Sequence, residues 1–286
     1  LNTENHHQLV ASTDSMVEGR HFLASTEPYL IGQKLMAVNL SDMAAMGARP
    51  KWITLNLTLP SIKEDWLSSF ADGFCKHAKL SQVSLVGGDL TRGTELNVSA
   101  QILGEVPTGQ SLLRSGADEN DQVYVTGMIG GAGSALSTLL KHEGDHSQLS
   151  EHQIKALYQP TSRVELGIEL RDYATAAIDV SDGLLHDLEL LCQASQVGAD
   201  LGLDAIPVDK NIDCMDAIIT GDDYELIFTA PEKFKNAINA LAKSTSCPIT
   251  SIGKLNQNSG CVNLFKDNKQ VSSPKVSGFD HFENQS

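Results

Sequence analysis

Acidic side chains recur in five short polar motifs along the chain. They occupy residues 12–14 (Ser-Thr-Asp), 39–42 (Asn-Leu-Ser-Asp), 87–89 (Gly-Gly-Asp), 179–183 (Asp-Val-Ser-Asp-Gly) and 221–223 (Gly-Asp-Asp). Carboxylates that meet in a cleft repel one another unless cations lie between them. Mg²⁺ prefers oxygen ligands of this kind and usually brings phosphates with it. The joint occurrence of the motifs therefore predicts a magnesium and phosphate site, although no single motif is specific.

Each acidic motif also has an ordinary structural explanation. Asp182 directly precedes an expected helix and could be only an N-cap. Gly88-Asp89 could be a simple turn. Asp42 is different, because it lies inside a helical pattern beside Met and Ala, where no cap is needed. We expect Asp42 to face a cleft as a ligand.

A glycine-rich segment and one arginine are further candidates for phosphate contacts. Residues 127–133 follow an expected strand and open a helix, so their backbone N–H groups could meet a phosphate. They match neither GxxxxGK[ST] nor GxGxxG, and a plain tight turn is the default interpretation. Arg114 could pair with a phosphate through its planar guanidinium group. A surface arginine is the alternative.

The histidines give one string that resembles a zinc-protease motif. Residues 142–146 read HEGDH and match HExxH, which binds zinc only on a helix. The Gly-Asp interior disfavours a helix, so we expect a solvated loop. His21 follows Asp14 by seven residues and is the better candidate for a functional role, although a lone histidine is more often structural.

The N-terminal part of the chain reads as a mixture of helices and strands that position these motifs. Apolar residues at helical spacing predict a helix over residues 30–46. Strict alternation predicts a strand over residues 53–59 with one buried face. Ser61 with Glu64 resembles a capping box that opens another helix. Two strands, at 83–86 and 97–106, are expected on either side of a Gly87-Gly88 turn.

The remainder of the chain repeats a strand–helix–strand order. We expect strands at 122–125, 176–180, 225–229 and 249–252, and helices from 134, at 184–194 and at 231–242. Residues 142–152 are expected to be a surface loop. This order predicts an α/β (α+β) fold in two domains, residues 1–107 and residues 108–286.

Composition excludes several classes of function. The 286 residues carry a formal net charge of −15, and the sequence pI is about 4.9. Nucleic-acid binding and docking on anionic lipid both require a basic face. No run of eighteen apolar residues suggests a membrane span. The five cysteines include no CxxC pair, so a disulfide framework is not expected and a reducing cytoplasm is the simplest location.

Taken in order, the motifs resemble the signatures of bacterial thiamine-monophosphate kinases. The resemblance runs from residue 12 to residue 282 and so covers nearly the whole chain. The matching segments are 12–22 (STDSMVEGRHF), 37–48 (AVNLSDMAAMGA), 87–93 (GGDLTRG), 114–117 (RSGA), 178–184 (IDVSDGL), 221–226 (GDDYEL) and 278–282 (GFDHF).

The resemblance implies a fold and an activity. The family belongs to the superfamily of aminoimidazole-ribonucleotide synthetase, with an N-terminal domain whose sheet forms a homodimer and a C-terminal α/β domain. Its members phosphorylate thiamine monophosphate with ATP and several Mg²⁺ ions, which gives thiamine diphosphate in the last step of its biosynthesis.

The resemblance also implies residue roles, motif by motif. Asp42, Asp89 and Arg114 would be the catalytic groups. The metal ligands would be Ser12, Thr13, Asp14, Asp42, Asp89, Asp179 and Asp182. The contacts to ATP would be Gly88, Asp89, Arg114 and Ser181. The thiamine-phosphate site would be lined by His21, Asp222 and Phe279.

Three departures from the family pattern are visible. The family has a Gly-Asp-Asp metal motif before residues 12–14, and none lies in residues 1–11. Since the chain begins at Leu1 rather than Met, we expect that motif just upstream of the sequence given. The usual Glu of Gly-Glu-Asp-Tyr-Glu-Leu is Asp222 here, and the usual closing Tyr is Phe279.

The expected chemistry needs no strong base. A phosphate monoester has a second pKa of roughly 6 and is mostly a dianion at neutral pH. Metal ions and Arg114 would neutralise the two polyanions and align an in-line transfer. Aminoimidazole-ribonucleotide synthetase, selenophosphate synthetase and a hydrogenase maturation protein are the alternatives within the superfamily. A non-catalytic metal-binding or nucleotide-sensing module is the alternative outside it.

Overall fold

The chain forms two compact units. The structure is a computed structural model, and it describes residues 3–276 and 278–279. Unit 1 contains Leu1–Ser111 and Ala135–Val164, and unit 2 contains Leu112–Ser134 and Glu165–Ser286. This division differs from the expected boundary after residue 107, because residues 135–164 belong with unit 1. Helix α4 (Glu151–Tyr158) of that segment contacts helix α1 (Pro28–Ala45), which explains the assignment.

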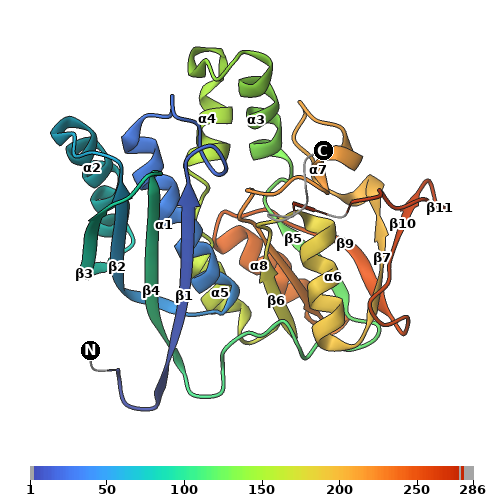
Figure 1. Ribbon diagram of the computed structural model, residues 1–286. Helices are drawn as coiled ribbons and strands as arrows, with labels where there is room; N and C mark the ends of the chain where they lie inside the picture. Colours follow the sequence, from blue (N-terminus) through green and yellow to red (C-terminus); the bar gives the residue numbers. More distant parts are fainter. Residues whose placement is uncertain (1–2, 277, 280–286) are drawn as a thin grey trace. The chain divides into compact units, whose positions relative to one another are not determined.

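Unit 1 is a four-stranded sheet with helices on one face. The strands are β1 (His7–Val17), β2 (Arg49–Leu59), β3 (Ser84–Arg92) and β4 (Asn97–Pro107), in the order β1-β4-β2-β3. Strand β4 runs antiparallel to β1 and β2, and β3 runs parallel to β2. Helices α1 (Pro28–Ala45) and α2 (Glu64–Leu80) lie behind this sheet in Figure 1. Among the described residues of unit 1, no helix packs on the opposite face of the sheet.

Helix α1 is the centre of unit 1. Pro28 opens it at a position where the missing N–H costs nothing, and it ends near Gly47. Thirteen of its residues are buried, because it packs on β1, β4 and α2 at once. Its apolar residues therefore surround it rather than form one stripe. The polar residues on this buried helix are accordingly the exceptional ones.

Residues 142–158 lie within the second segment of unit 1, Ala135–Val164. They follow α3 (Gly131–Lys141) and contain a 3₁₀ turn (His146–Gln148) and α4 (Glu151–Tyr158), which begins at a Ser150–Gln153 capping box. The HExxH string is therefore not helical, as expected. Nε2 of His146 and the Tyr158 hydroxyl instead form a 2.9 Å hydrogen bond.

Unit 2 is a seven-stranded sheet in the order β11-β10-β7-β9-β5-β8-β6. Within the described part of this sheet, β7 and β10 pair in parallel and the other neighbours pair antiparallel. The strands are β5 (Gln122–Thr126), β6 (Ala176–Asp179), β7 (Gly198–Gly202), β8 (Leu226–Ala230), β9 (Ile249–Asn256), β10 (Val262–Lys266) and β11 (Lys269–Val271). The helices are α5 (Val164–Leu170), α6 (Leu184–Ser195), α7 (Cys214–Ala217) and α8 (Lys235–Ser244), with short 3₁₀ turns at Leu203–Ala205 and Glu232–Phe234.

Helix α6 covers one face of the second sheet. It packs on β6, β7 and β10, and its leucines join a buried apolar cluster with residues of β5 and β8. Figure 1 shows α6 in front of the sheet. On the other face, Tyr124 and Phe228 stack with ring centroids 5.1 Å apart. Both faces of the central strands are thus buried, which holds the strand ends rigidly.

Two local predictions from the sequence are wrong. Gly87-Gly88 is not a turn, because β3 continues through it in register with Thr54 and Leu55 of β2. A Cβ on Gly88 would overlap the carbonyl oxygen of Leu55, so this glycine permits close strand approach. The expected capping box at Ser61 is also absent. The N-cap of α2 is Lys63, without a side-chain hydrogen bond.

Two general expectations agree with the described part of the chain. The five cysteines form no disulfide among the described residues. No helix in the described ranges is both long enough and apolar enough to cross a membrane.

Helices α1 and α2 cross at two glycines, and this contact generates a stability prediction. A Cβ on Gly73 would overlap the carbonyl group of Tyr29, and one on Gly32 would overlap that of Phe70. Gly73→Ala should therefore lower the free energy of unfolding by about 1–3 kcal/mol, as overpacking does. Urea unfolding measures this, with the exposed neighbour Asp72→Ala as control. Equal stability of the two variants would contradict the close packing.

Candidate functional site

Unit 1 joins two of the acidic motifs directly. The Ser12 hydroxyl of β1 donates a 2.6 Å hydrogen bond to Oδ2 of Asp42 on α1. Ser12 and Asp14 are half-buried and alternate with exposed residues along β1, so both face the helix side of the sheet. Asp42 is also half-buried, although most of its helix is buried. These three oxygen-bearing side chains therefore share one face of the sheet.

Thr13 and Asp89 do not belong to this set of side chains. Thr13 is exposed on the opposite face of β1. Asp14 of β1 is in register with Ala100 of β4, and Ala100 is in register with Leu55 of β2. Asp89 of β3 is in register with Asn56, the residue of β2 that follows Leu55. Neighbouring positions on a strand point to opposite faces. Asp89 thus lies on the helix-free face, and one chain does not gather all the predicted side chains of unit 1.

His21 is held in the loop between β1 and α1. The backbone N–H of Val17 donates to Nδ1 of His21 at 3.0 Å. Because an N–H can only donate, Nδ1 must be the acceptor, and Nε2 carries the proton of the neutral ring. The His21 carbonyl oxygen also accepts from the buried Lys34 ammonium group at 3.5 Å. The Val17 contact and the Lys34 contact thus fix this histidine at both its ring and its backbone.

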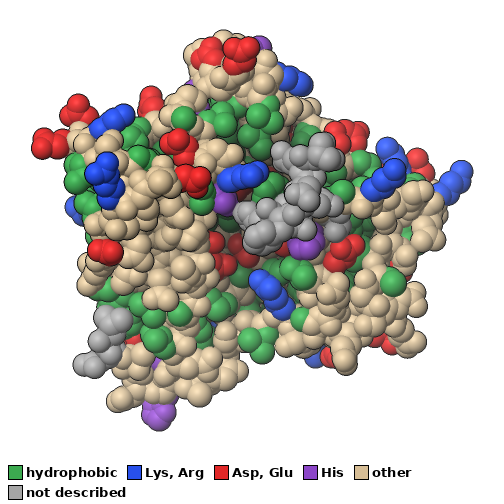
Figure 2. Space-filling view, viewed as in Figure 1, with side chains coloured by type: hydrophobic (Ala, Val, Ile, Leu, Met, Phe, Trp, Pro, Cys, Tyr) green, Lys and Arg blue, Asp and Glu red, His purple; other side chains and the backbone are tan. Residues whose placement is uncertain are grey.

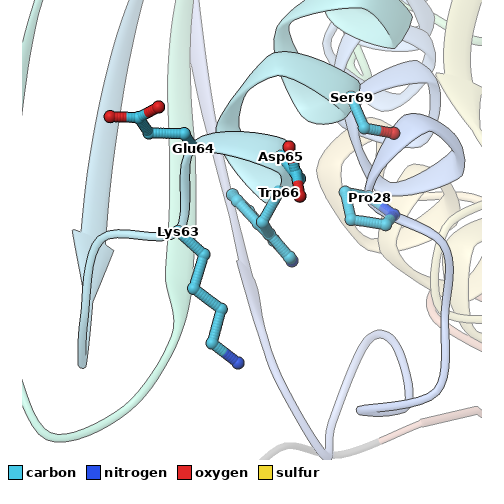
Figure 3. Close-up of a pocket in the computed structure, with 6 residues that line it drawn as sticks. All are labelled: Pro28, Lys63, Glu64, Asp65, Trp66 and Ser69. Atoms are coloured by element: carbon cyan, nitrogen blue, oxygen red, sulfur yellow. The ribbon is translucent and has the colours of Figure 1, made fainter.

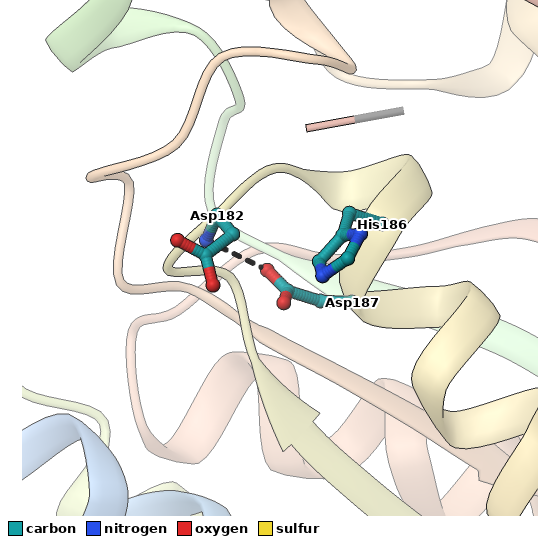
Figure 4. A group of neighbouring side chains, drawn as sticks. All are labelled: Asp182, His186 and Asp187. Atoms are coloured by element: carbon teal, nitrogen blue, oxygen red, sulfur yellow. Dashed lines mark hydrogen bonds between the residues drawn. The ribbon is translucent and has the colours of Figure 1, made fainter. Parts of the chain in front are cut away.

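In unit 2 the loop between β6 and α6 is fixed by a residue that the sequence analysis did not identify. Oδ2 of Asp187 accepts hydrogen bonds from the backbone N–H groups of Ser181, Asp182 and Gly183, at 2.9, 3.1 and 3.2 Å. Figure 4 shows the Asp187 carboxylate beneath this loop. Asp182 does not cap α6, because the N-cap residue is Gly183 and no side chain caps the helix. Asp187 instead holds the loop that precedes the helix. An Asp in the first turn of a helix was the available signal.

Three carboxylates give this loop a strongly negative character. Asp179 is buried at the end of β6, and Asp182 is half-buried. Burial, followed by the charge of Asp179, raises the pKa of Asp187 to about 7, although its backbone hydrogen bonds act in the opposite direction. Ligand atoms of Asp182, His186 and Asp187 all lie within 4.8 Å of one another. Two carboxylates and one imidazole at this spacing have the chemistry to bind a cation.

The backbone of the same loop holds two further motifs. The carbonyl oxygen of Ser181 accepts from the N–H of Asp222 at 2.8 Å, and that of Val180 accepts from the N–H of Tyr224 at 2.8 Å. The carbonyl oxygen of Asp182 accepts from the N–H of Phe279 at 2.9 Å. The structure thus brings together the predicted residues Ser181, Asp182, Asp222 and Phe279. The end of the closing motif, residues 280–282, lies outside the described residues.

The glycine-rich turn is used internally. The N–H of Gly130 donates to Oδ2 of Asp223 at 2.7 Å, and the N–H of Ala132 approaches Oδ1 at 3.4 Å. Asp223 is buried, and its carboxylate therefore already accepts the two N–H groups that a phosphate would need. This supports the plain-turn interpretation of residues 127–133. Burial raises the pKa of Asp223 to about 8, opposed by the two backbone hydrogen bonds and assisted by the charge of Glu225.

Two other features complete the geometry. Arg114 is exposed, and its backbone carbonyl accepts from the Ser195 hydroxyl at 2.9 Å.

A pocket of about 670 Å³ lies at the start of α2 (Figure 3). None of the predicted site residues lines it, and Glu64 and Asp65 at the helix start disfavour a phosphate there. The pocket lining comprises Pro28, Lys63, Glu64, Asp65, Trp66 and Ser69.

Comparisons with known proteins identify the class of fold. Residues 1–106 match the family model "AIR synthase related protein, N-terminal domain", and residues 118–262 match "AIR synthase related protein, C-terminal domain". The chain thus has the two-domain fold of the AIR synthase related proteins.

Similarity to individual proteins gives the family. The thiamine-monophosphate kinase of Salmonella typhimurium is 39% identical over 99% of this chain and 89% of that protein. A crystal structure of thiamine-monophosphate kinase from Stenotrophomonas maltophilia K279a is 38% identical, with a TM-score of 0.87 over 95% of this chain and 89% of that chain. AaThiL complexed with AMPPCP and TMP is 28% identical, with a TM-score of 0.85 over 98% and 89%. The chain belongs to the thiamine-monophosphate kinase family.

The buried Asp223 generates a prediction about pH. The unfolded chain loses this proton near the ordinary pKa of 3.8, whereas the folded protein keeps it up to about pH 8. The folded state binds more protons in this window, so its stability falls as pH rises, by at most about 1.4 kcal/mol per pH unit from this group. Asp223→Asn should therefore lose less stability than wild type between about pH 5 and about pH 7.5 in urea unfolding.

The control for this comparison is Asp216→Asn, which replaces an exposed Asp of the same unit. Its pH profile should follow that of wild type. Parallel profiles for wild type and Asp223→Asn would show that Asp223 ionises alike in the folded and unfolded states.

Proposed function

We propose that this chain transfers the terminal phosphoryl group of ATP to thiamine monophosphate and so forms thiamine diphosphate, the last step of that biosynthesis. The observation that carries the proposal is 39% identity over 99% of the chain to a thiamine-monophosphate kinase. The relative AaThiL was solved with AMPPCP and TMP, an ATP analogue and a ligand of the expected acceptor class. The substrates proposed here are accordingly ATP and thiamine monophosphate.

Mg²⁺ is the proposed cofactor, and the donor set fits it. Ser12, Asp14 and Asp42 present hydroxyl and carboxylate oxygens on one face of unit 1. Asp179 and Asp182 present carboxylates in unit 2. Hard divalent cations select such oxygen ligands, and when bound they neutralise phosphate charge. We assign the metal-holding role to these five residues, and propose that Thr13 takes part through its backbone, since its side chain lies on the other face of β1.

The proposed mechanism has no general base. The acceptor phosphate is mostly a dianion at neutral pH, since its second pKa is roughly 6. His21 supports this view, because Nδ1 already accepts from Val17 and Nε2 carries a proton. We therefore propose that His21 donates a hydrogen bond to the thiamine-phosphate substrate. Asp42 holds charge-neutralising cations, and Arg114 pairs with a phosphate through its guanidinium group.

The other predicted contacts keep their proposed roles. Gly88, Asp89 and Ser181 are proposed to contact ATP, and Asp222 and Phe279 to line the thiamine-phosphate site. The backbone bonds from Asp222 to Ser181 and from Phe279 to Asp182 support a shared site for the residues of unit 2.

We further propose that the protein is a homodimer that assembles through the helix-free face of the first sheet. On this face, Leu103 of β4 is in register with Ala11 of β1 on one side and with Trp52 of β2 on the other. Asp89 lies on the same face, so its contribution to catalysis would depend on dimer formation. The proposed location is the cytoplasm, and the absence of a disulfide among the described cysteines supports a reducing compartment.

The proposed chemistry predicts different effects for two substitutions. Asp42→Asn removes a charge that holds cations. Because this costs several kcal/mol of transition-state stabilisation, kcat should fall by about 100-fold or more. His21→Ala should mainly raise the KM for thiamine monophosphate. A coupled assay for ADP release, with product analysis, measures both. If His21→Ala abolished turnover at saturating substrate while metal binding stayed intact, the mechanism without a base would be wrong.

The proposed dimer predicts a paired loss of assembly and activity. Ala11 is exposed in one chain, so Ala11→Arg should fold normally but place a charge in the interface. We expect a monomer by light scattering at concentrations where wild type is a dimer, with activity reduced at least about 10-fold. Asp72→Arg on the exposed side of α2 is the control. A dimeric Ala11→Arg protein would place the interface elsewhere.

A further inference from the structure

The segment that carries Asp222 has an unusual backbone. Asp222 and Tyr224 both adopt left-handed conformations, with φ of 68° and 51°, on either side of Asp223. Residues other than glycine rarely adopt such angles, and a bulky side chain like that of Tyr224 does so least readily. Strained backbone of this kind persists only where the surroundings enforce it, and it is enriched at functional sites.

The surroundings of this segment enforce the conformation at three points. The N–H groups of Asp222 and Tyr224 are held by the carbonyl oxygens of Ser181 and Val180, both at 2.8 Å. Between them, the Asp223 side chain is buried and accepts from the backbone of the glycine-rich turn. The preceding Gly221 has no room for a Cβ against the Ser181 backbone. Asp223 thus anchors the segment from inside.

The consequence of this backbone is a contact between the two side chains that flank the anchor. The Tyr224 hydroxyl donates a 2.9 Å hydrogen bond to Oδ1 of Asp222, and both residues are half-buried. A hydrogen bond to an ionised carboxylate is short and strong, so it limits the rotation of that carboxylate. An Asp has only two side-chain torsions, so one such bond restricts it strongly.

We propose that Tyr224 is a positioning residue that orients the Asp222 carboxylate toward the cationic, amino-bearing heterocycles of the thiamine-phosphate substrate. This inference rests on the proposed function. Asp222 is shorter than the Glu that the family motif usually carries at this position. Its reach toward a ligand therefore depends on a fixed orientation, which the Tyr224 hydroxyl supplies.

Tyr224→Phe tests the proposal, because it removes only the hydroxyl and keeps the ring. The KM for thiamine monophosphate should rise about 3- to 30-fold, the effect of losing a hydrogen bond to a charged group, while kcat and the KM for ATP stay within about 2-fold. The matched control is Tyr173→Phe in the same unit, whose ring packs edge-on against Phe234. Its three kinetic constants should equal those of wild type.

A double-mutant cycle separates positioning from a merely structural role. If Tyr224 acts through Asp222, then adding Tyr224→Phe to Asp222→Asn should change the KM for thiamine monophosphate by less than about 2-fold. Full additivity of the two effects would overturn the inference. So would a Tyr224→Phe enzyme with the same KM as the Tyr173→Phe control.

The outcomes also distinguish this inference from the proposed function. A wild-type protein that forms no thiamine diphosphate refutes the proposed function, and with it the substrate named here. An active wild type with an unaffected Tyr224→Phe variant refutes only the role of Tyr224. Because unfolding midpoints are compared for all variants, a loss of stability in Tyr224→Phe is detected directly. In that case, an unchanged KM for thiamine monophosphate in Asp222→Asn would overturn the inference.

Discussion

Three backbone carbonyl groups in the loop after β6 hold the candidate site of unit 2 together. Those of Val180, Ser181 and Asp182 accept hydrogen bonds from Tyr224, Asp222 and Phe279, which belong to two segments that are far from this loop in the sequence. From the other side, Asp187 accepts the N–H groups of residues 181–183. The backbone polar groups of the loop are thus satisfied within the unit. The conformation of the loop is therefore fixed by contacts of its backbone.

In unit 1 the candidate site is held in place by side chains on rigid elements. Ser12 on β1 meets Asp42 on α1, and α1 is fixed against α2 by glycines at their crossing. A helix that packs so closely on its neighbours cannot shift without disturbing the sheet as well. The carboxylate of Asp42 is therefore presented at a fixed distance from β1. Such preorganisation is what metal and phosphate chemistry requires, because developing charge is met by groups already in place.

The elements that the sequence predicts well are those whose signal is local. The alternation over residues 53–59 and the helical spacing over residues 30–46 and 184–194 correspond to β2, α1 and α6 within a few residues. Strand β1 was not predicted, because its central residues are Ser, Thr and Asp and only pairing with β4 makes them a strand. The Gly87-Gly88 pair suggested a turn for the same reason, since the neighbouring strand decides its conformation.

The candidate site shows a similar division. Residue types and motif order indicated the oxygen-rich, phosphate-directed chemistry and the family that the comparisons confirm. The roles of Asp187 and Tyr224 could not be predicted, because each depends on a contact created by a turn. The face on which Asp89 lies could not be predicted either, since it follows from the β2–β3 register.

Part of the net charge of −15 now has a structural explanation, since acids such as Asp42, Asp179 and Asp182 lie at fixed, half-buried or buried positions rather than on an open surface.

A single-turnover reaction with γ-labelled ATP, Mg²⁺ and thiamine monophosphate tests the central claim most directly. The account predicts label in thiamine diphosphate, and only when all three are present. Binding of both ligands with the label remaining in ATP would contradict it and would indicate a nucleotide-sensing protein instead.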